Sequence, residues 1–270
     1  MMVRASRWQA LLLAAIAVCA LPLLALLLAA PSAVMWSEGI AAAVSSWNGG
    51  GWRLLRGGLA WLAAPATLAV VLWCLIRMLR TGRTQDAATA FVLALGSFLM
   101  SEAFKLNVLP LPGYGPDGDR NISGHVAMVA GALIVVVIAA PTARRRLVAA
   151  LASTIVVLTS LGVVAARWHD AGDLIVPLMV GTAWSVVARA LFVLREHGES
   201  EPSRRRVVQG AAALALLCAL AAWSLVSQAG ALSGALALLA ALLAVLAATI
   251  ATALAAIGVA EILENWSRST

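Results

Sequence analysis

The stretch from Val207 to Ala260 reads VVQGAAALALLCALAAWSLVSQAGALSGALALLAALLAVLAATIATALAAIGVA and has no charged side chain in 54 positions. One helical crossing of a bilayer takes about 20 mostly apolar residues. The stretch therefore has room for two spans, which we separate around Gln228 to Gly234. It is composed almost entirely of small and aliphatic residues, so we interpret it as an accessory transmembrane hairpin without chemistry of its own.

The rest of the chain has the same apolar character. Of the 270 residues, 63% are hydrophobic and 11% are charged, against about 25% charged in an average soluble domain, which excludes a soluble globular protein. The apolar runs do not alternate with polar residues as the strands of a membrane β-barrel do, and a helix satisfies its own backbone hydrogen bonds in lipid. We therefore predict an all-α polytopic transmembrane bundle. Its eight expected spans cover residues 8–30, 58–79, 87–104, 124–141, 147–166, 174–194, 207–227 and 232–258.

Charged segments divide this bundle into a six-span core and the C-terminal hairpin. We expect a first span and an interfacial Trp-rich segment over 1–57, a membrane core carrying the site over 58–194, a charged cytoplasmic linker over 195–206, and the hairpin and tail over 207–270. The run 8–30 is longer than a signal-peptide core and no Ala-x-Ala site follows it, so we expect it to be retained as a span. The three cysteines fall inside apolar runs and predict neither a disulfide nor a metal site.

Basic residues are distributed unevenly between the two sides of the predicted bundle. Fourteen of the 19 Lys and Arg residues fall on the side of the two termini. Cytoplasmic loops carry an excess of Lys and Arg, so we predict an integral protein of the cytoplasmic (inner) membrane with both termini in the cytoplasm. The basic residues stand at the ends of apolar runs, which indicates contact with anionic lipid headgroups and not with nucleic acid. The opposite side, facing the periplasm or outside, carries Arg53, Arg56, Lys105, Arg120 and Arg167.

Two loops of that opposite side hold the reactive side chains. The first loop ends in Ser123-Gly124-His125, and the second contains His169 and Asp173. Residues four apart share a helical face, so Asp173 is expected to accept a hydrogen bond from one ring nitrogen of His169. The other ring nitrogen is then available for nucleophilic attack. His125, from the other loop, is expected to protonate the departing oxygen as a general acid.

Groups suited to an anion accompany the histidines. The segment Ser123-Gly124 stands at the expected start of the fourth span, where free N–H groups of a helix N-terminus bind anions. Lys105, Arg120 and Arg167 supply positive charge, and Glu102 is expected to pair with Lys105. Phosphoryl transfer depends on positioning and charge stabilisation, so this composition favours it.

The paired motifs resemble those of the type 2 phosphatidic acid phosphatase superfamily, which includes lipid phosphate phosphatases and the sphingomyelin synthases. They are Gly-Asp-x-x-x-Ser-Gly-His over 118–125 and His-x-x-x-Asp over 169–173. The resemblance implies a six-span helical core with its site at the outer face of the membrane. It also implies that His169 is a nucleophile forming a phosphohistidine, with Asp173 as its partner and His125 as general acid. The candidate substrate-binding residues are Lys105, Asp119, Arg120, Ser123, Gly124 and Arg167.

Two arginines of the phosphatase pattern are absent. At the family's distance after Lys105 the chain has Pro112-Gly113 in place of Arg-Pro. Val163 stands six residues before the last histidine, where the family has an arginine. The histidine motif without that upstream arginine is more similar to the sphingomyelin synthase branch. Arg120 and Arg167 are the candidates to replace the missing charges.

The sequence therefore predicts a metal-independent membrane lipid phosphatase that hydrolyses a phosphomonoester or diphosphate of a lipid and needs no cofactor. One alternative is a sphingomyelin synthase-like phosphotransferase that moves a phospho-headgroup between lipids. A second alternative is a non-enzymatic membrane protein that retains a degenerate site. A zinc site is disfavoured, because no His-x-x-x-His or cysteine pair accompanies the two histidines.

Overall fold

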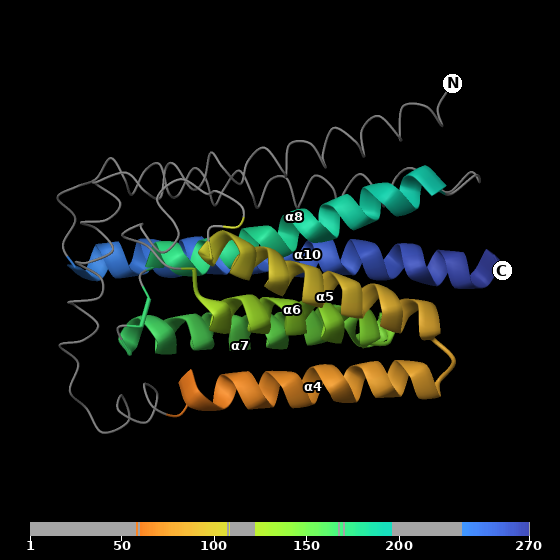
Figure 1. The fold of residues 1–270 in the computed structure, drawn as a ribbon, viewed down its shortest axis with the longest axis horizontal. Coiled ribbons are helices and arrows are strands. Elements are labelled where there is room, and N and C mark those ends of the chain that lie inside the picture. The colour runs from red at the N-terminus through yellow and green to blue at the C-terminus, as the bar shows by residue number, and fades with distance from the viewer. Residues whose placement is uncertain are drawn as a thin grey trace.

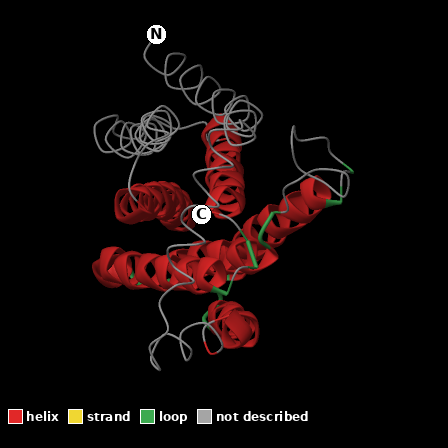
Figure 2. Cartoon of the chain, turned by 90° about the vertical axis from the view of Figure 1, so that its left-hand side faces the viewer, coloured by secondary structure: helices red, strands yellow, loops and turns green. Residues whose placement is uncertain are grey.

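The computed structural model describes residues 58, 60–106, 108, 122–166, 168–169, 171–195 and 234–269. Within these ranges every regular element is helical, and the long helices lie side by side in a bundle (Figure 1 and, seen from one end, Figure 2). The expected all-α fold is confirmed for this part of the chain. In chain order the elements are α4 (Ala60–Arg80), α5 (Thr84–Lys105), α6 (Gly124–Ala139), the 3-10 helix η2 (Thr142–Arg144), α7 (Arg145–Ala165), α8 (Ala171–Arg195) and α10 (Gly234–Ser269).

Five of the six described α-helices, all except α6, are long and apolar enough to cross a membrane, as a helical membrane bundle requires. Helix α6 has 16 residues and measures about 24 Å at 1.5 Å per residue, somewhat less than the roughly 30 Å of a hydrocarbon core. The expected spans 8–30 and 207–227, and the segment 31–57 between the first two spans, lie outside the described residues. The total of eight spans therefore stays a prediction.

Local sequence determines both ends of α6. Ser123 is its N-cap, and its hydroxyl accepts a hydrogen bond from the Val126 N–H at 3.4 Å. At the other end, Ala140 has an extended backbone with φ −69° and ψ 140°. A proline disfavours the helical conformation in the residue before it, and Pro141 follows. The span expected over 124–141 thus ends at Ala139.

Helix α6 is the centre of the described bundle. It packs against α4, α5, α7, α8 and α10, and most of its side chains are buried. Close approach to α5 occurs at Gly131, where an added Cβ would lie 3.3 Å from the Ala94 carbonyl oxygen. Small residues allow this kind of contact between membrane helices. The helix that carries Ser123-Gly124-His125 at its beginning is therefore held from several sides.

The connection between α4 and α5 is a tight turn. Gly82 has φ 76°, a left-handed conformation that glycine adopts without steric cost and that commonly ends helices. Arg83 follows, and its guanidinium donates to Asp86 at 2.6 Å and to the carbonyls of Ile138 and Ala139 at 2.9 and 3.2 Å. The turn is thus joined to the C-terminal end of α6.

Helix α10 runs without interruption for 36 residues and packs against α8, α6 and α7. We expected its span to end at residue 258, but the helix continues to Ser269. The extension holds Glu264, which forms an ion pair with Arg145 and accepts from the Thr142 hydroxyl at 2.6 Å. Farther along α10, the buried Thr252 hydroxyl donates to the Leu178 carbonyl of α8 at 3.0 Å. The second half of the expected accessory hairpin is therefore part of the bundle core, while the division into domains stays a prediction.

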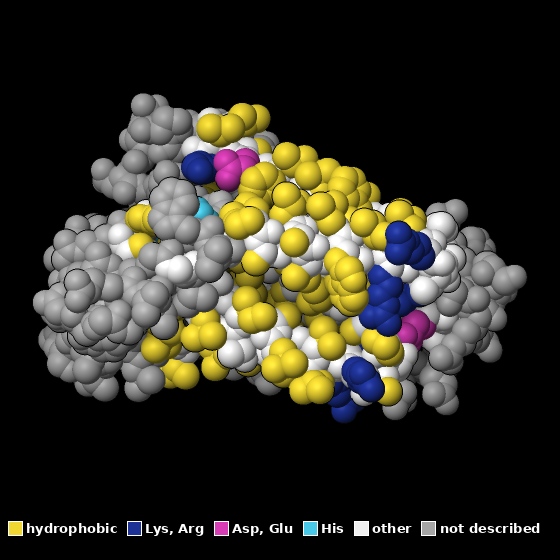
Figure 3. Space-filling view, turned by 90° about the horizontal axis from the view of Figure 1, so that it is seen from below, with side chains coloured by type: hydrophobic (Ala, Val, Ile, Leu, Met, Phe, Trp, Pro, Cys, Tyr) yellow, Lys and Arg dark blue, Asp and Glu magenta, His cyan; other side chains and the backbone are white. Residues whose placement is uncertain are grey.

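The outer surface of the described bundle is apolar between two polar ends. Large hydrophobic side chains are exposed on the outward faces of α4, α5 and α7, among them Trp73, Phe91 and Ile155. Figure 3 shows this apolar surface, with most of the visible Lys and Arg side chains toward one end and a basic side chain beside an acidic one at the other. An exposed apolar surface of this extent fits contact with lipid. The orientation of the bundle in a membrane stays the prediction made from its charges.

Candidate active site

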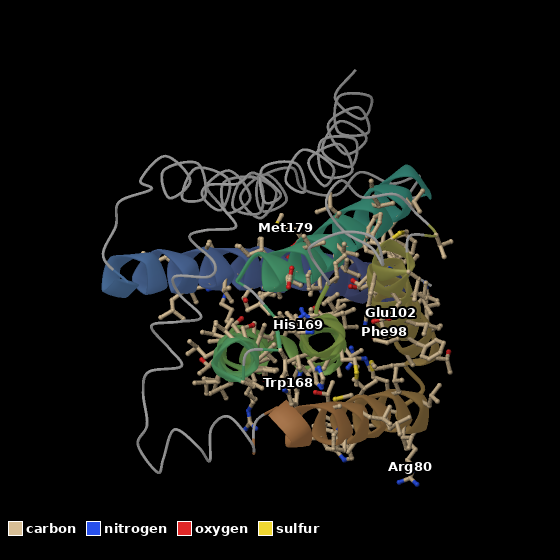
Figure 4. All side chains as sticks on the ribbon, turned by 60° about the vertical axis from the view of Figure 1, so that its left-hand side comes forward. Arg80, Phe98, Glu102, Trp168, His169 and Met179 are labelled. Atoms are coloured by element: carbon tan, nitrogen blue, oxygen red, sulfur yellow. The ribbon has the colours of Figure 1, made fainter. Side chains whose placement is uncertain are left out.

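The two motif segments meet at the end of the bundle opposite the arginine-rich turns. Helix α5 ends there, and α6 and α8 begin there (Figure 1). Figure 4 shows Trp168 and His169 at this end, before α8, with Glu102 coming from α5. The topology therefore brings together side chains that lie far apart in the sequence.

A backbone hydrogen bond joins the two motifs directly. The Ser123 N–H donates to the Asp173 carbonyl at 3.1 Å. Both residues are buried, with exposed fractions of 0% and 5%, and buried backbone groups are almost always paired. This contact joins the start of α6 to the first turn of α8, and with them the two motifs.

His169 and Asp173 form a close pair of titratable groups in the described part of this junction. Nδ1 of His169 lies 3.6 Å from Oδ2 of Asp173, and their side chains are 13% and 6% exposed. The expectation assumed that one helical face carries both residues. The structure has His169 in the bend two residues before α8, and Asp173 in the first turn of that helix. The ring nevertheless lies close to the carboxylate.

His125 lies in the first turn of α6 and faces the second motif. Its ring packs against the indole of Trp168, with 5.3 Å between centroids and 41° between planes. It is also close enough to His169 and Lys105 to interact with both electrostatically. These contacts agree with the prediction that the two histidines, which belong to different loops, lie close together.

Lys105 and Glu102 occupy the last turn of α5 beside this group. Nζ of Lys105 lies 3.7 Å from Oε2 of Glu102, so the expected pairing of these residues is confirmed. The other carboxylate oxygen of Glu102 lies against the start of α6, where a Cβ added to Gly124 would be 3.0 Å away from it. Both charged side chains are only about one-third exposed or less, and lower exposure strengthens charge interactions.

The hydroxyl of Ser123 has a structural role that the motif alone did not indicate. It is fully buried and caps α6 by accepting the Val126 N–H. A contribution to phosphate binding by this residue stays a prediction. Three further candidates, Asp119, Arg120 and Arg167, lie outside the described residues. Among the residues described, no group of three His, Cys, Asp or Glu side chains is arranged to hold a metal ion.

Sequence reasoning missed two contacts of the site. Trp168 was one residue of the second loop without an assigned role, and its ring packs on His125. Glu102 was expected only as the partner of Lys105, and it also approaches Gly124. Neither contact has a sequence signature, because each joins residues from different helices or loops.

Comparison with known proteins gives no match, since no family model, no curated protein and no solved structure matches this chain. The class of protein is therefore defined by the fold and by the junction of the two motifs. The described chain is an apolar helical bundle of the kind that spans membranes, with two histidines, two carboxylates and a lysine gathered at one end.

Proposed function

We propose that this protein is an integral membrane lipid phosphatase that hydrolyses a phosphomonoester or diphosphate of a lipid through a phosphohistidine. The observation that carries the proposal is the junction of the two motifs. The Ser123 N–H bonds to the Asp173 carbonyl at 3.1 Å, while His125 interacts electrostatically with both His169 and Lys105. The resemblance of these motifs to the type 2 phosphatidic acid phosphatases supports the same reaction class.

Each histidine has one role in the proposed reaction. Nδ1 of His169 faces the Asp173 carboxylate at 3.6 Å, so Nε2 is the nitrogen that attacks phosphorus. An N–P bond forms, the P–O bond to the lipid breaks, and His125 gives its proton to the leaving oxygen. Water then attacks the phosphohistidine, gives a proton back to His125 and releases phosphate, which restores Nε2.

Lys105 binds the phosphoryl oxygens of the substrate, and the beginning of α6 stabilises the charge that builds up on them. Such electrostatic stabilisation is usually the largest single contribution to this kind of catalysis. Arg120 and Arg167 belong to the same two loops in the sequence, and we assign them to the substrate-binding set. The site then faces the periplasm or outside, as the arginine-rich turns at the opposite end of the bundle indicate.

A phosphotransferase is the second candidate, and the pairing of Lys105 with Glu102 at 3.7 Å favours it. This carboxylate offsets the positive charge of the lysine, and two arginines of the phosphatase pattern are absent. A less positive site is better matched to the single negative charge of a phosphodiester than to the two charges of a monoester. In this alternative, a lipid hydroxyl takes the place of water.

The test is phosphate release by the purified protein in vesicles that contain phosphatidic acid or a polyprenyl diphosphate. We expect release by the wild-type protein and a loss of more than about a thousandfold in His169→Ala, because the nucleophile is gone. His197→Ala is the matched control, since it removes the histidine of the charged linker and should leave release unchanged. Full activity in His169→Ala would overturn the mechanism.

A labelled headgroup separates the two candidates. A phosphatase produces free phosphate, whereas a transferase produces a labelled acceptor lipid without free phosphate. If the protein yields neither product and tolerates substitution of both histidines, the non-enzymatic alternative is correct.

A further inference from the structure

A proline stands inside α8 at a position that bears on the junction of the two motifs. Pro177 lies four residues after Asp173 and is buried. In an α-helix the carbonyl of each residue accepts from the N–H four residues later. Proline has no N–H, so Pro177 cannot supply this hydrogen bond to Asp173.

The Asp173 carbonyl accepts a hydrogen bond from outside its helix. Its donor is the Ser123 N–H at 3.1 Å, on the residue that caps α6. Proline is tolerated in membrane helices where neighbouring groups satisfy the carbonyl that it leaves unpaired. Here the neighbouring group belongs to the first motif, two residues before His125.

We propose that Pro177 is a positioning residue, which reserves the Asp173 carbonyl for Ser123 and thereby holds the His125 segment against the His169–Asp173 segment. Pro177 touches neither substrate nor reacting atoms in this proposal and acts through the main chain. Its effect on turnover rests on the proposed function, whereas the hydrogen bond itself does not.

Two substitutions restore the missing N–H and differ in size. Pro177→Ala leaves a smaller side chain, and Pro177→Val nearly conserves the volume, so an effect common to both comes from the N–H. Pro65→Ala is the matched control, because Pro65 is an exposed proline inside α4, a helix without site residues.

The first measurement is backbone hydrogen exchange of the full-length protein in lipid nanodiscs, read on the peptide that contains Ser123. A helical N–H at position 177 competes for the Asp173 carbonyl, so exchange should become about two- to tenfold faster in both Pro177 variants, as expected for one hydrogen bond. Exchange should be unchanged in Pro65→Ala. Unchanged exchange in the Pro177 variants would overturn the proposal, because it would mean that one carbonyl accepts both donors.

The second measurement is kcat and KM for phosphate release from phosphatidic acid. We expect kcat to fall on the order of tenfold in both Pro177 variants, because small misplacements of reacting groups are costly, with KM changed much less. Faster exchange with wild-type kcat would overturn the positioning role. If the wild-type protein releases no phosphate, the proposed function fails, and the exchange measurement still decides whether Pro177 controls the hydrogen bond.

Discussion

The two ends of the bundle hold charged side chains of similar exposure in different ways. Arg83 at the arginine-rich end and Lys105 at the site end have side chains that are 34% and 32% exposed. Arg83 lies 2.6 Å from its carboxylate partner and also donates to two main-chain carbonyls. Lys105 lies 3.7 Å from its own carboxylate partner. The exposed fraction does not distinguish these residues, but their pairing distances do.

This difference separates charges that hold the fold from charges that can meet a ligand. A guanidinium bound in short contacts to a carboxylate and to carbonyls has its donors engaged in fixed directions. The ammonium of Lys105, 3.7 Å from its carboxylate partner and one-third exposed, is held less tightly and can contact a ligand at little cost. We therefore expect substitutions at the site end to change activity, and substitutions at the arginine-rich end to change stability.

Among the substitutions that compare the two ends, the largest effect on turnover is expected from His125→Gln. Glutamine keeps a polar side chain of similar size but cannot act as a general acid, so kcat should fall by about 10² to 10⁴. The thermal midpoint should stay close to that of the wild-type protein, because the His125 side chain is not part of the buried core. Steady-state phosphate release and thermal unfolding of the same preparation check both statements. A variant with more than half of the wild-type kcat would contradict the assigned role.

The next effect is expected at the opposite end, from Arg145→Ala. This side chain is 3% exposed and pairs with Glu264, and it also donates to the Ala140 carbonyl at 3.3 Å. Removing the guanidinium takes the ion-pair partner from Glu264, whose side chain is 25% exposed and keeps its hydrogen bond from Thr142, so the variant should lose about 2 kcal/mol of stability, less than for a fully buried pair. Unfolding in detergent measures the loss, and kcat per folded molecule should remain within about twofold of the wild type.

A double substitution sharpens this prediction. Arg145→Met combined with Glu264→Gln removes both charges, and it should recover at least part of the lost stability because no partly buried charge is left alone. An Arg145→Ala variant that stays folded and lowers kcat as strongly as His125→Gln does would contradict the assignment of stability to one end of the bundle and activity to the other.

The smallest effect is expected from Lys105→Met, which removes the ammonium and keeps the aliphatic chain. KM for the phosphorylated lipid should rise about tenfold, as for the loss of one hydrogen bond to a charged group, while kcat changes less. Lys105→Arg keeps the charge and should stay near the wild-type KM. Initial rates over a range of lipid mole fractions in mixed micelles measure both constants. An unchanged KM in Lys105→Met would remove this lysine from the substrate-binding set.

Hydropathy predicted most of the described fold, because the end of an apolar run is a local property. The run expected over 147–166 became α7 (Arg145–Ala165), and the run over 58–79 became α4 (Ala60–Arg80). The last run was the exception, since α10 continues to Ser269. Its extension contains Glu264, whose ion-pair partner Arg145 lies 119 residues away, and a local measure of hydropathy cannot register such a partner.

The candidate site was predictable as a set of residues but not as a geometry. The spacing of His169 and Asp173 indicated a pair, and the structure has them 3.6 Å apart. The hydrogen bond from the Ser123 N–H to the Asp173 carbonyl joins two main-chain groups, so no side-chain pattern reports it. The sequence contains one signal of this hydrogen bond, the proline four residues after Asp173. Proline has no N–H, so the Asp173 carbonyl needs a donor other than the one that a helix normally supplies.

The contacts of Arg83 and Arg145 with the last carbonyls of α6 complement the dipole of that helix. They bring two guanidinium groups to the carbonyls of Ile138, Ala139 and Ala140. A helix macrodipole carries about half a positive charge at its N-terminus and half a negative charge at its C-terminus. The guanidinium groups satisfy the carbonyls at the negative pole of α6, while the positive pole, beside His125, is the end of the helix that a substrate anion approaches in the proposed reaction.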